Sequence, residues 1–435
     1  MFKIPELLQD TVPTVEIVDS IMGSRKTTKM LEWIDKHYTT DRFIYVSPLI
    51  SEVGDGGRIH RDLKYAKFHS PDDKVGNKSD DLLLMLNEGL NICCTHSLYL
   101  LMDRRHLAAI KKHNYILIID EEIGVISDYN RYSDSDLDSL MTLGCIDRQE
   151  SDGMLLWIST DSSFDKPNHK YYNLKRNIDS GVVYTAKRSN KMVVTQLPVK
   201  LFTVAKRTII ITYMFEGNIL SCFLKLKGVH YKPFTEITPI EVNKSNIKKL
   251  ITMYDIKGKW RVLDSFKLSN TWYTAKTSYK NSTTKDIKMI ENFISSFARN
   301  TGCDFFDLMY TFPKDKRFDN GNKKRISPKS LIDRDVINDI TGEVELEKVW
   351  IATQTRATND YAHKTHLVHA FNRYPNTSIQ SYLQDYGQGV DADIFAVSEL
   401  VQWVWRSAIR NGEPIVLCIV SKRMRKLFDL WLHED

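Results

Sequence analysis

A strand, a loop of small residues and a helix follow one another near the start of the chain. Residues 15–34 read Val-Glu-Ile-Val-Asp-Ser-Ile-Met-Gly-Ser-Arg-Lys-Thr-Thr-Lys-Met-Leu-Glu-Trp-Ile. The first four predict a buried strand, and the spacing of Met30, Leu31 and Ile34 predicts a helix with one apolar face. The loop between them lies at the amino end of the helix, where backbone N–H groups attract an anion. The pattern therefore predicts an α/β unit with a phosphate-binding loop.

The residues of this loop match the phosphate-binding pattern G-x-x-x-x-G-K-[ST] in part. Lys26 and Thr27 occupy the last two positions, whereas Ser20 and Arg25 stand where the pattern has glycine. In this pattern the lysine reaches the outer phosphates and the hydroxyl ligates Mg²⁺. A side chain at position 25 must point away from the phosphates or contact them itself. We expect the nucleotide to be bound by Gly23, Ser24, Arg25, Lys26, Thr27 and Thr28.

An apolar run that ends in three carboxylates gives a second signal. Residues 115–119 predict a buried strand, and Asp120, Glu121 and Glu122 follow it directly. In P-loop enzymes an Asp in this place helps to hold Mg²⁺, and another residue orients the attacking water. Acidic residues also end strands by chance, but this run follows the loop candidate in the order that such enzymes need. We therefore predict that Thr27 and Asp120 hold Mg²⁺ and that Glu121 activates water.

Further continuous apolar runs alternate with helical patterns. Such runs are typical of parallel sheets covered by helices, so the predicted fold class is α/β. The runs predict strands at residues 43–47, 91–95, 115–119 and 208–212, with helices at 80–87 and 104–112. A polar passage with prolines then separates two expected domains, residues 1–240 and 241–435. In the second domain the patterns predict strands at 261–264, 349–352, 366–369 and 414–420, and a helix over 287–297.

A third signal lies near the end of the chain. Residues 396–412 predict one helix that ends at Asn-Gly, and Gln402, Arg406 and Arg410 recur every four residues along it. Residues at this spacing share a helix face, and an arginine pair there suits a phosphate clamp. A solvated basic stripe is the alternative. The neighbouring Trp403 favours a mostly buried helix, in which unpaired arginines are costly, and hence the clamp.

Together these segments resemble superfamily 2 helicases. Residues 22–28 resemble the M-G-S-G-K-T-T loop of herpesvirus origin-binding helicases, and Asp120-Glu121 resembles the D-E-x-x box. Residues 402–410 resemble the Q-x-x-G-R-x-x-R box, with Trp405 in place of its glycine and one extra residue before the second arginine. Residues 355–361 are similar to segments of helicase-like proteins encoded by phages and prophages.

The resemblance implies two RecA-like domains with ATP and Mg²⁺ bound in the cleft between them. It implies that Lys26, Glu121, Gln402, Arg406 and Arg410 act in catalysis. It also implies nucleic-acid contacts, which we predict at Ser47, Thr95, Thr353, Arg356 and Thr358. The family has an S-A-T motif where this chain reads Thr212-Tyr-Met-Phe, which bears on how hydrolysis is coupled to movement.

The composition is compatible with these expectations but does not by itself predict them. The net charge of +6 permits a polyanionic partner, and no apolar run approaches the length of a membrane span. A basic loop at residues 314–325, with Lys323, Lys324 and Arg325, is either a hairpin that tracks a nucleic-acid backbone or a solvated charged loop. The six scattered cysteines favour reduced thiols, and we expect a cytoplasmic protein, in a host cell if it is phage-encoded.

The favoured function is an ATP-dependent helicase or translocase in phage or mobile-element replication. Its expected partners are single-stranded or duplex nucleic acid, with DNA favoured, and a replication protein that helps to load it. Two alternatives stay open. One is a nucleic-acid-stimulated ATPase that clamps or switches without unwinding. The other is a non-enzymatic interaction protein with a decayed P-loop, for which Arg25 is the main support.

Overall fold

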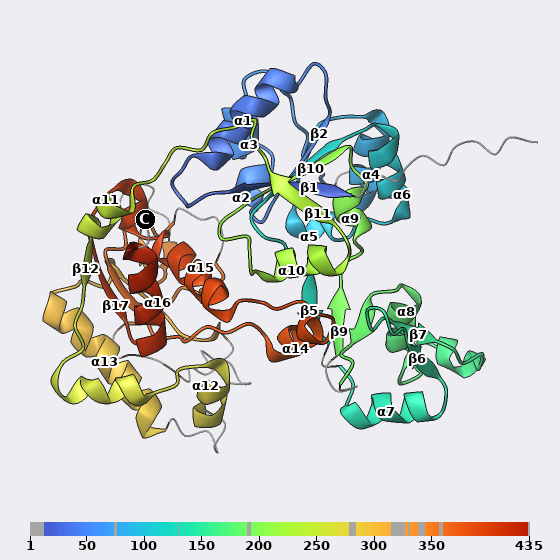
Figure 1. The fold of residues 1–435 in the computed structure, drawn as a ribbon. Coiled ribbons are helices and arrows are strands. Elements are labelled where there is room, and N and C mark those ends of the chain that lie inside the picture. The colour runs from blue at the N-terminus through green and yellow to red at the C-terminus, as the bar shows by residue number, and fades with distance from the viewer. Residues whose placement is uncertain are drawn as a thin grey trace, which may run out of the picture. The chain divides into compact units, whose positions relative to one another are not determined.

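A computed structural model describes residues 13–73, 76–129, 131–188, 193–277, 284–314, 326, 328, 331–337, 344–355 and 360–433. The chain forms two compact units (Figure 1). Unit 1 comprises residues 1–240 together with residues 375–391, and unit 2 comprises residues 241–374 together with residues 392–435. Among the described residues, no helix is both long and apolar enough to cross a membrane.

Unit 1 is built on a sheet of six parallel strands in the order β11-β1-β10-β4-β2-β3. The strands are β1 (Thr14–Asp19), β2 (Phe43–Ser47), β3 (Ile92–Thr95), β4 (Ile116–Asp120), β10 (Arg207–Thr212) and β11 (His230–Pro233). All four strands expected from continuous apolar runs are present, and β2 and β4 are buried along their whole length. The pattern did not predict β11, because its side chains are mostly exposed. The predicted α/β class, with parallel sheets flanked by helices, is confirmed.

Helices flank this sheet (Figure 1). They are α1 (Lys26–His37), α2 (Ile50–Val53), α3 (Arg58–Asp62), α4 (Lys78–Glu88), α5 (His96–Tyr99), α6 (Arg104–Lys112), α9 (Lys200–Thr203) and α10 (Ile219–Leu226). The predicted apolar face of α1 is buried, because Met30, Leu31 and Ile34 pack in one core cluster with residues of β2, β4 and β10. Helix α1 is thereby fixed directly after the loop that begins at the end of β1.

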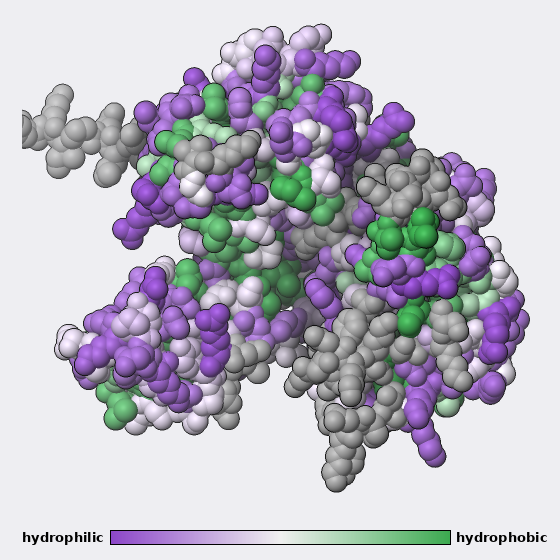
Figure 2. Space-filling view, turned by 180° about the vertical axis from the view of Figure 1, so that it is seen from behind, coloured by the Kyte–Doolittle hydropathy of each residue, from purple (hydrophilic) through white to green (hydrophobic). Residues whose placement is uncertain are grey.

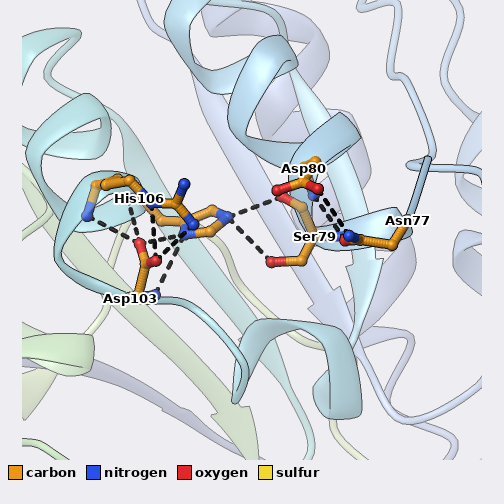
Figure 3. A network of polar contacts seen from close by, with 6 residues as sticks. Asn77, Ser79, Asp80, Asp103 and His106 are labelled. Atoms are coloured by element: carbon orange, nitrogen blue, oxygen red, sulfur yellow. Dashed lines mark hydrogen bonds and ion pairs between the residues drawn. The ribbon is translucent and has the colours of Figure 1, made fainter. Parts of the chain in front are cut away.

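Polar contacts at their first turns join α4 and α6 (Figure 3). Asn77 caps α4 by accepting hydrogen bonds from two backbone N–H groups, and Asp103 forms a capping box with His106 at the start of α6. The fully buried His106 ring has Nδ1 2.8 Å from Asp103 Oδ1 and Nε2 2.9 Å from the Ser79 carbonyl oxygen. The same histidine therefore completes one helix cap and binds the neighbouring helix.

A small lobe is inserted between β4 and β10 of unit 1. It contains β5 (Ile126–Asp128), α7 (Asp134–Thr142), β6 (Ile146–Arg148), β7 (Leu155–Trp157), the 3-10 helix η1 (Ser162–Asp165), α8 (Tyr172–Asp179), β8 (Val183–Thr185) and β9 (Val193–Gln196). Its strands pair antiparallel and enclose a separate core that includes Leu137, Leu174 and Val193. In Figure 2 hydrophilic side chains cover most of this lobe. Its strands are only three or four residues long, so the sequence contains no apolar run long enough to predict them.

A later segment of the chain returns to this lobe. Helix α14 (Thr377–Asp385) lies beside β5 and β9 (Figure 1). The Tyr382 hydroxyl donates to the Asp152 carbonyl oxygen at 2.6 Å, and the Tyr386 hydroxyl donates to the Thr185 carbonyl oxygen at 3.1 Å. Beyond the helix, the Asp391 N–H donates to the Gly217 carbonyl oxygen at 2.9 Å. Unit 1 is therefore completed by residues far from it in sequence.

Unit 2 has a sheet of four parallel strands in the order β12-β17-β16-β13. Its strands are β12 (Ile251–Met253), β13 (Leu308–Thr311), β16 (His366–His369) and β17 (Ile415–Ile419), and a separate antiparallel pair joins β14 (Arg334–Ile337) to β15 (Val344–Glu347). The accompanying helices are α11 (Lys244–Leu250), α12 (Asn270–Thr277), α13 (Lys285–Thr301), α15 (Ala392–Val404) and α16 (Lys422–His433), with the 3-10 helices η2 (Gly258–Ser265) and η4 (Ala408–Asn411). The buried face of α13 supplies much of the core.

Three expected elements of unit 2 differ in the structure. The strand predicted at residues 261–264 is part of η2, and the one at 349–352 is reduced to a single bridge between Tyr310 and Trp350. The helix predicted over residues 396–412 ends at Val404. It ends there because the Ala408 N–H donates to the Lys364 carbonyl oxygen at 2.9 Å instead of to a helical partner. These are tertiary contacts, which local periodicity does not record.

Gly153 lies close to the Thr185 carbonyl oxygen of the lobe and to the hydroxyl of Tyr386, one residue beyond α14. We predict that Gly153→Ala destabilises the lobe, because a Cβ there would lie 2.2 Å from both the Thr185 carbonyl oxygen and the Tyr386 hydroxyl. Gly144→Ala is the matched control: Gly144 has φ +66° and Gly153 has φ +77°, but nothing lies within 4 Å of a Cβ at Gly144. Each substitution should lower stability by about 1–2 kcal/mol, because alanine disfavours left-handed backbone. The clash at Gly153 should add at least about 1 kcal/mol in that variant alone.

Amide hydrogen exchange over residues 137–185 measures this difference as the free energy of local opening. Equal loss of protection in the two variants would show that these two contacts do not constrain position 153.

Candidate functional site

The predicted loop and carboxylates meet at one edge of the unit 1 sheet. Strand β10 lies between β1 and β4, and the register pairs Asp19 with Thr212 and Ile211 with Asp120. Because all three strands are parallel, the loops that follow them open at the same edge. In open α/β sheets ligands bind outside the carboxyl ends of the strands. The strand order therefore brings together two segments that are about a hundred residues apart in the chain.

The loop after β1 has the backbone of an anion-binding turn. Gly23 has φ 83°, and Arg25 has φ 56° and ψ 25°, which is left-handed. Glycine is the usual residue for such a conformation. Arg25 therefore has the left-handed backbone that glycine has in the pattern, at a steric cost. Its side chain is exposed, while that of Ser24 is fully buried. No side chain caps α1, so its first N–H groups are available for an anion.

Lys26 spans the ends of two strands. Its Nζ donates to the Ser20 carbonyl oxygen at 2.7 Å and to the Thr212 carbonyl oxygen at 3.0 Å. Burial lowers the pKa of Lys26, and the charges of Asp120, Glu121 and Asp19 oppose that shift. An ammonium group has three N–H donors, so these two bonds leave one for a phosphate oxygen.

Asp120 stands opposite the first turn of α1. Its Oδ2 accepts a hydrogen bond from the Thr27 hydroxyl at 3.2 Å and another from the Tyr45 hydroxyl at 2.7 Å. The backbone carbonyl oxygen of Asp120 also lies 2.9 Å from His96 Nε2. Asp120 is only 5% exposed, so these contacts hold a nearly buried carboxylate in one orientation. The structure thus brings together Lys26, Thr27 and Asp120, as the sequence predicted.

Backbone strain is concentrated at this edge. Of the five described non-glycine residues with positive φ, three lie in the loops that follow β1, β4 and β10: Arg25, Glu121 and Met214. The Asp19 carboxylate holds the third loop by accepting hydrogen bonds from the N–H groups of Met214 and Phe215 at 2.7 and 2.8 Å. Strained backbone of this kind is characteristic of functional sites. Glu121, the predicted water-activating residue, is half-buried.

The donor set suits a magnesium ion only together with a phosphate ligand. Among the described residues, no group of three or more His, Cys, Asp or Glu could hold a metal by itself. Mg²⁺ is commonly held by one or two protein oxygens, several waters and substrate phosphates. The Thr27 hydroxyl and the Asp120 carboxylate, 3.2 Å apart, fit that role.

Two of the predicted nucleic-acid contacts have hydroxyls engaged within the protein. Ser47 is fully buried, and its hydroxyl donates to Glu52 Oε2 at 2.8 Å. The Thr95 hydroxyl caps α5 by accepting from the Leu98 N–H. Burial is the first cause that raises the pKa of Glu52, and nearby Asp120 raises it further. These hydroxyls bind nucleic acid only if their present hydrogen bonds are exchanged.

The predicted residues of unit 2 do not share one helix face. Gln402 lies in the last turn of α15, where its Nε2 donates to the Ser398 hydroxyl at 3.1 Å. Arg406 lies beyond the helix end and is 5% exposed, whereas Arg410 lies in η4 and is exposed. Thr353 is buried at 7% exposure. The predicted Arg356, Thr358, Lys323, Lys324 and Arg325 lie outside the described residues.

Sequence reasoning missed Tyr45, Asp19 and the pair Glu52 and Arg58. Arg58 Nη2 donates to the Thr28 hydroxyl at 3.2 Å, and Arg58 Nη1 lies 3.6 Å from Glu52 Oε1. Tyr45 alone left a signal, because a tyrosine in an otherwise apolar strand needs a partner for its hydroxyl. The others become visible only when the strands are placed side by side.

The fold and the edge that it forms define an α/β protein with a Rossmann-like C-terminal part. Residues 245–432 match the family model of the YonV C-terminal Rossmann-like domain, which lies within unit 2 apart from residues 375–391. The chain is also 28% identical to the SPbeta prophage-derived uncharacterized protein YonV of Bacillus subtilis (strain 168), over 446 aligned residues. That alignment covers 97% of this chain and 99% of that protein, so the similarity includes unit 1.

The left-handed backbone at Arg25 predicts a gain in stability on substitution by glycine. Arg25→Gly removes a steric cost of about 1–2 kcal/mol, and the greater entropy of unfolded glycine returns about half of that. We expect Arg25→Gly to be more stable than Arg25→Ala by about 0.5–1 kcal/mol. Arg25→Ala is the control because it removes the same charge and keeps the Cβ. The measurement is the thermal unfolding midpoint followed by circular dichroism, and equal midpoints would contradict the strain.

Proposed function

We propose that this chain is a magnesium-dependent ATPase that acts on nucleic acid, most simply as a DNA helicase or translocase. The observation that carries the proposal is the convergence of Lys26, Thr27 and Asp120 at the carboxyl edge of three adjacent parallel strands. Each group has a distinct task in phosphoryl transfer, and their chain order agrees with the helicase resemblance.

The residues of unit 1 divide these tasks between them. The third N–H of Lys26 and the first N–H groups of α1 bind the outer phosphates. Thr27 and Asp120 hold Mg²⁺, which when bound neutralises charge on the phosphates. Glu121 follows Asp120 directly and activates the attacking water. We propose that Gln402, Arg406 and Arg410 supply the arginine-finger contacts that the resemblance implies, with the exposed Arg410 the more accessible of the two arginines.

The loop geometry supports an intact nucleotide site over a decayed P-loop. Arg25 was the main argument for decay, yet it takes the left-handed conformation that glycine usually takes and points its side chain to the surface. An ATPase clamp that does not unwind is the second candidate. The sequence Thr212-Tyr-Met-Phe favours it, because the Asp19 carboxylate anchors this segment where helicases have S-A-T. A strand-displacement assay on tailed duplexes separates the two.

The proposed partner and setting rest on other observations. The relative that aligns along nearly the whole chain is prophage-derived, which supports a phage or mobile-element origin and a role in DNA replication. The net charge of +6 and the basic residues of the 314–325 loop support a polyanionic partner. A replication protein that helps to load the enzyme completes the proposal.

Loss of the lysine charge should abolish ATP hydrolysis. We predict that Lys26→Ala lowers turnover by about 10³-fold or more and weakens ATP binding, because the phosphate charge is no longer compensated. Glu121→Gln should keep ATP binding and lose turnover. Lys29→Ala is the matched control, since Lys29 lies on the same helix but pairs with Glu32 at the surface. Phosphate release and equilibrium binding of a fluorescent ATP analogue are measured. Unchanged hydrolysis in Lys26→Ala would disprove the site.

Nucleic acid should bind mainly through its phosphates. We predict that single-stranded DNA stimulates hydrolysis and that its affinity falls steeply with salt. Changing Lys323, Lys324 and Arg325 together to alanine should lower the slope of log affinity against log salt by about 2. The control removes the same charges from α6, as Arg104→Ala, Lys111→Ala and Lys112→Ala, at three exposed positions. Fluorescence anisotropy gives both slopes, and equal slopes would show that the loop is only a solvated surface.

A further inference from the structure

A fully buried tyrosine lies beside the metal-binding carboxylate. Tyr45 is the central residue of β2, and its exposure is 0%. Strand β2 pairs with β4, and the register sets Tyr45 opposite Ile118, two residues before Asp120. A tyrosine is buried so completely only when its hydroxyl has a partner. Here the hydroxyl donates to Asp120 Oδ2 at 2.7 Å.

Other buried tyrosines show that this partner is unusual within the fold. The Tyr115 hydroxyl donates to the Leu90 carbonyl oxygen at 2.7 Å, and the Tyr273 hydroxyl donates to the Ala370 carbonyl oxygen at 2.6 Å. Both acceptors are backbone groups far from the site, and both bonds satisfy the hydroxyl equally well. Hydrogen bonding in the core therefore does not by itself require a carboxylate partner. We therefore look for the reason that Tyr45 binds a carboxylate in the role of Asp120 itself.

Asp120 Oδ2 receives two hydroxyl groups at once. The Tyr45 hydroxyl approaches from β2, and the Thr27 hydroxyl approaches from α1 at 3.2 Å. Two donors on one oxygen fix the rotation of the carboxylate. Both of these bonds are on Oδ2, and the other oxygen, Oδ1, is the one that we expect to bind the metal ion.

We propose that Tyr45 is a positioning residue that holds Asp120 for Mg²⁺ binding. The inference rests on the proposed function, because it concerns the metal of the same site. Groups that orient metal ligands from behind commonly contribute 10- to 100-fold to metal affinity. Removing the Tyr45 hydroxyl leaves Oδ2 with the Thr27 hydroxyl alone and lets the carboxylate turn. We therefore expect the affinity for Mg²⁺ to fall, while the nucleotide contacts of Lys26 and α1 stay in place.

The test compares two tyrosine-to-phenylalanine changes on the same sheet. Tyr45→Phe removes the hydroxyl that binds Asp120. Tyr115→Phe removes the hydroxyl of another fully buried tyrosine just before β4, at the opposite end of that strand from Asp120. A fluorescent ATP analogue is titrated onto each full-length variant, first without Mg²⁺ and then at fixed nucleotide with increasing Mg²⁺. We expect Tyr45→Phe to raise the half-saturating Mg²⁺ concentration by about 10-fold or more. Metal-free nucleotide affinity should stay within twofold in both variants.

The outcomes separate this inference from the proposed function. Equal Mg²⁺ midpoints in wild type, Tyr45→Phe and Tyr115→Phe would overturn the role of Tyr45 and leave the nucleotide site standing. Wild-type protein that binds no nucleotide with or without Mg²⁺ would overturn the proposed function and this inference with it. Equal losses in Tyr45→Phe and Tyr115→Phe would show a general effect of core disruption. Thermal midpoints monitor folding, and Tyr45→Met replaces Tyr45→Phe if the latter does not fold.

Discussion

The parallel pairing of β1 with β10 and of β10 with β4 is the constraint on which the candidate site depends. It places the ends of three strands at one edge, so that Lys26 can bind a carbonyl oxygen of β10 and Thr27 can bind a carboxylate of β4. None of these groups is close to all of its partners in sequence. The hydrophobic core under α1 and β2 holds the strands in this order, and the arrangement of side chains at the edge follows from it.

Electrostatics distinguish this edge from an ordinary ion-pair cluster. Asp19, Asp120 and Glu121 act on a single buried ammonium group, Lys26, whose pKa burial lowers. A buried cation with several carboxylates around it is costly unless further charges complete the set. A divalent cation bound together with a polyphosphate would balance these charges, because the cation pairs with the carboxylates and the phosphates pair with the lysine. Backbone strain is concentrated at the same edge, at Arg25, Glu121 and Met214.

Residue patterns predicted the parallel strands of unit 1 and the apolar face of α1, because long buried runs leave an unambiguous signal. They also predicted that Lys26, Thr27 and Asp120 come together, because each stands in a loop or at a strand end that has its own local pattern. They failed where the controlling contact is distant. The helix predicted across Arg406 stops at Val404 because Lys364 accepts the Ala408 N–H, and Tyr45 gained its role only from its neighbour on β4. The inserted lobe was missed because its strands are too short to show a period.

The late return of α14 has a consequence for folding during synthesis. The sheet of unit 1 is complete once β11 has emerged, but the lobe receives Tyr382 and Tyr386 only after residues 241–374 have been made. At ribosomal rates that delay is on the order of ten seconds. Throughout it the lobe surface that α14 will cover stays open to other chains. The lobe of the nascent protein is therefore without its last helix until residues 241–374 of unit 2 have been made.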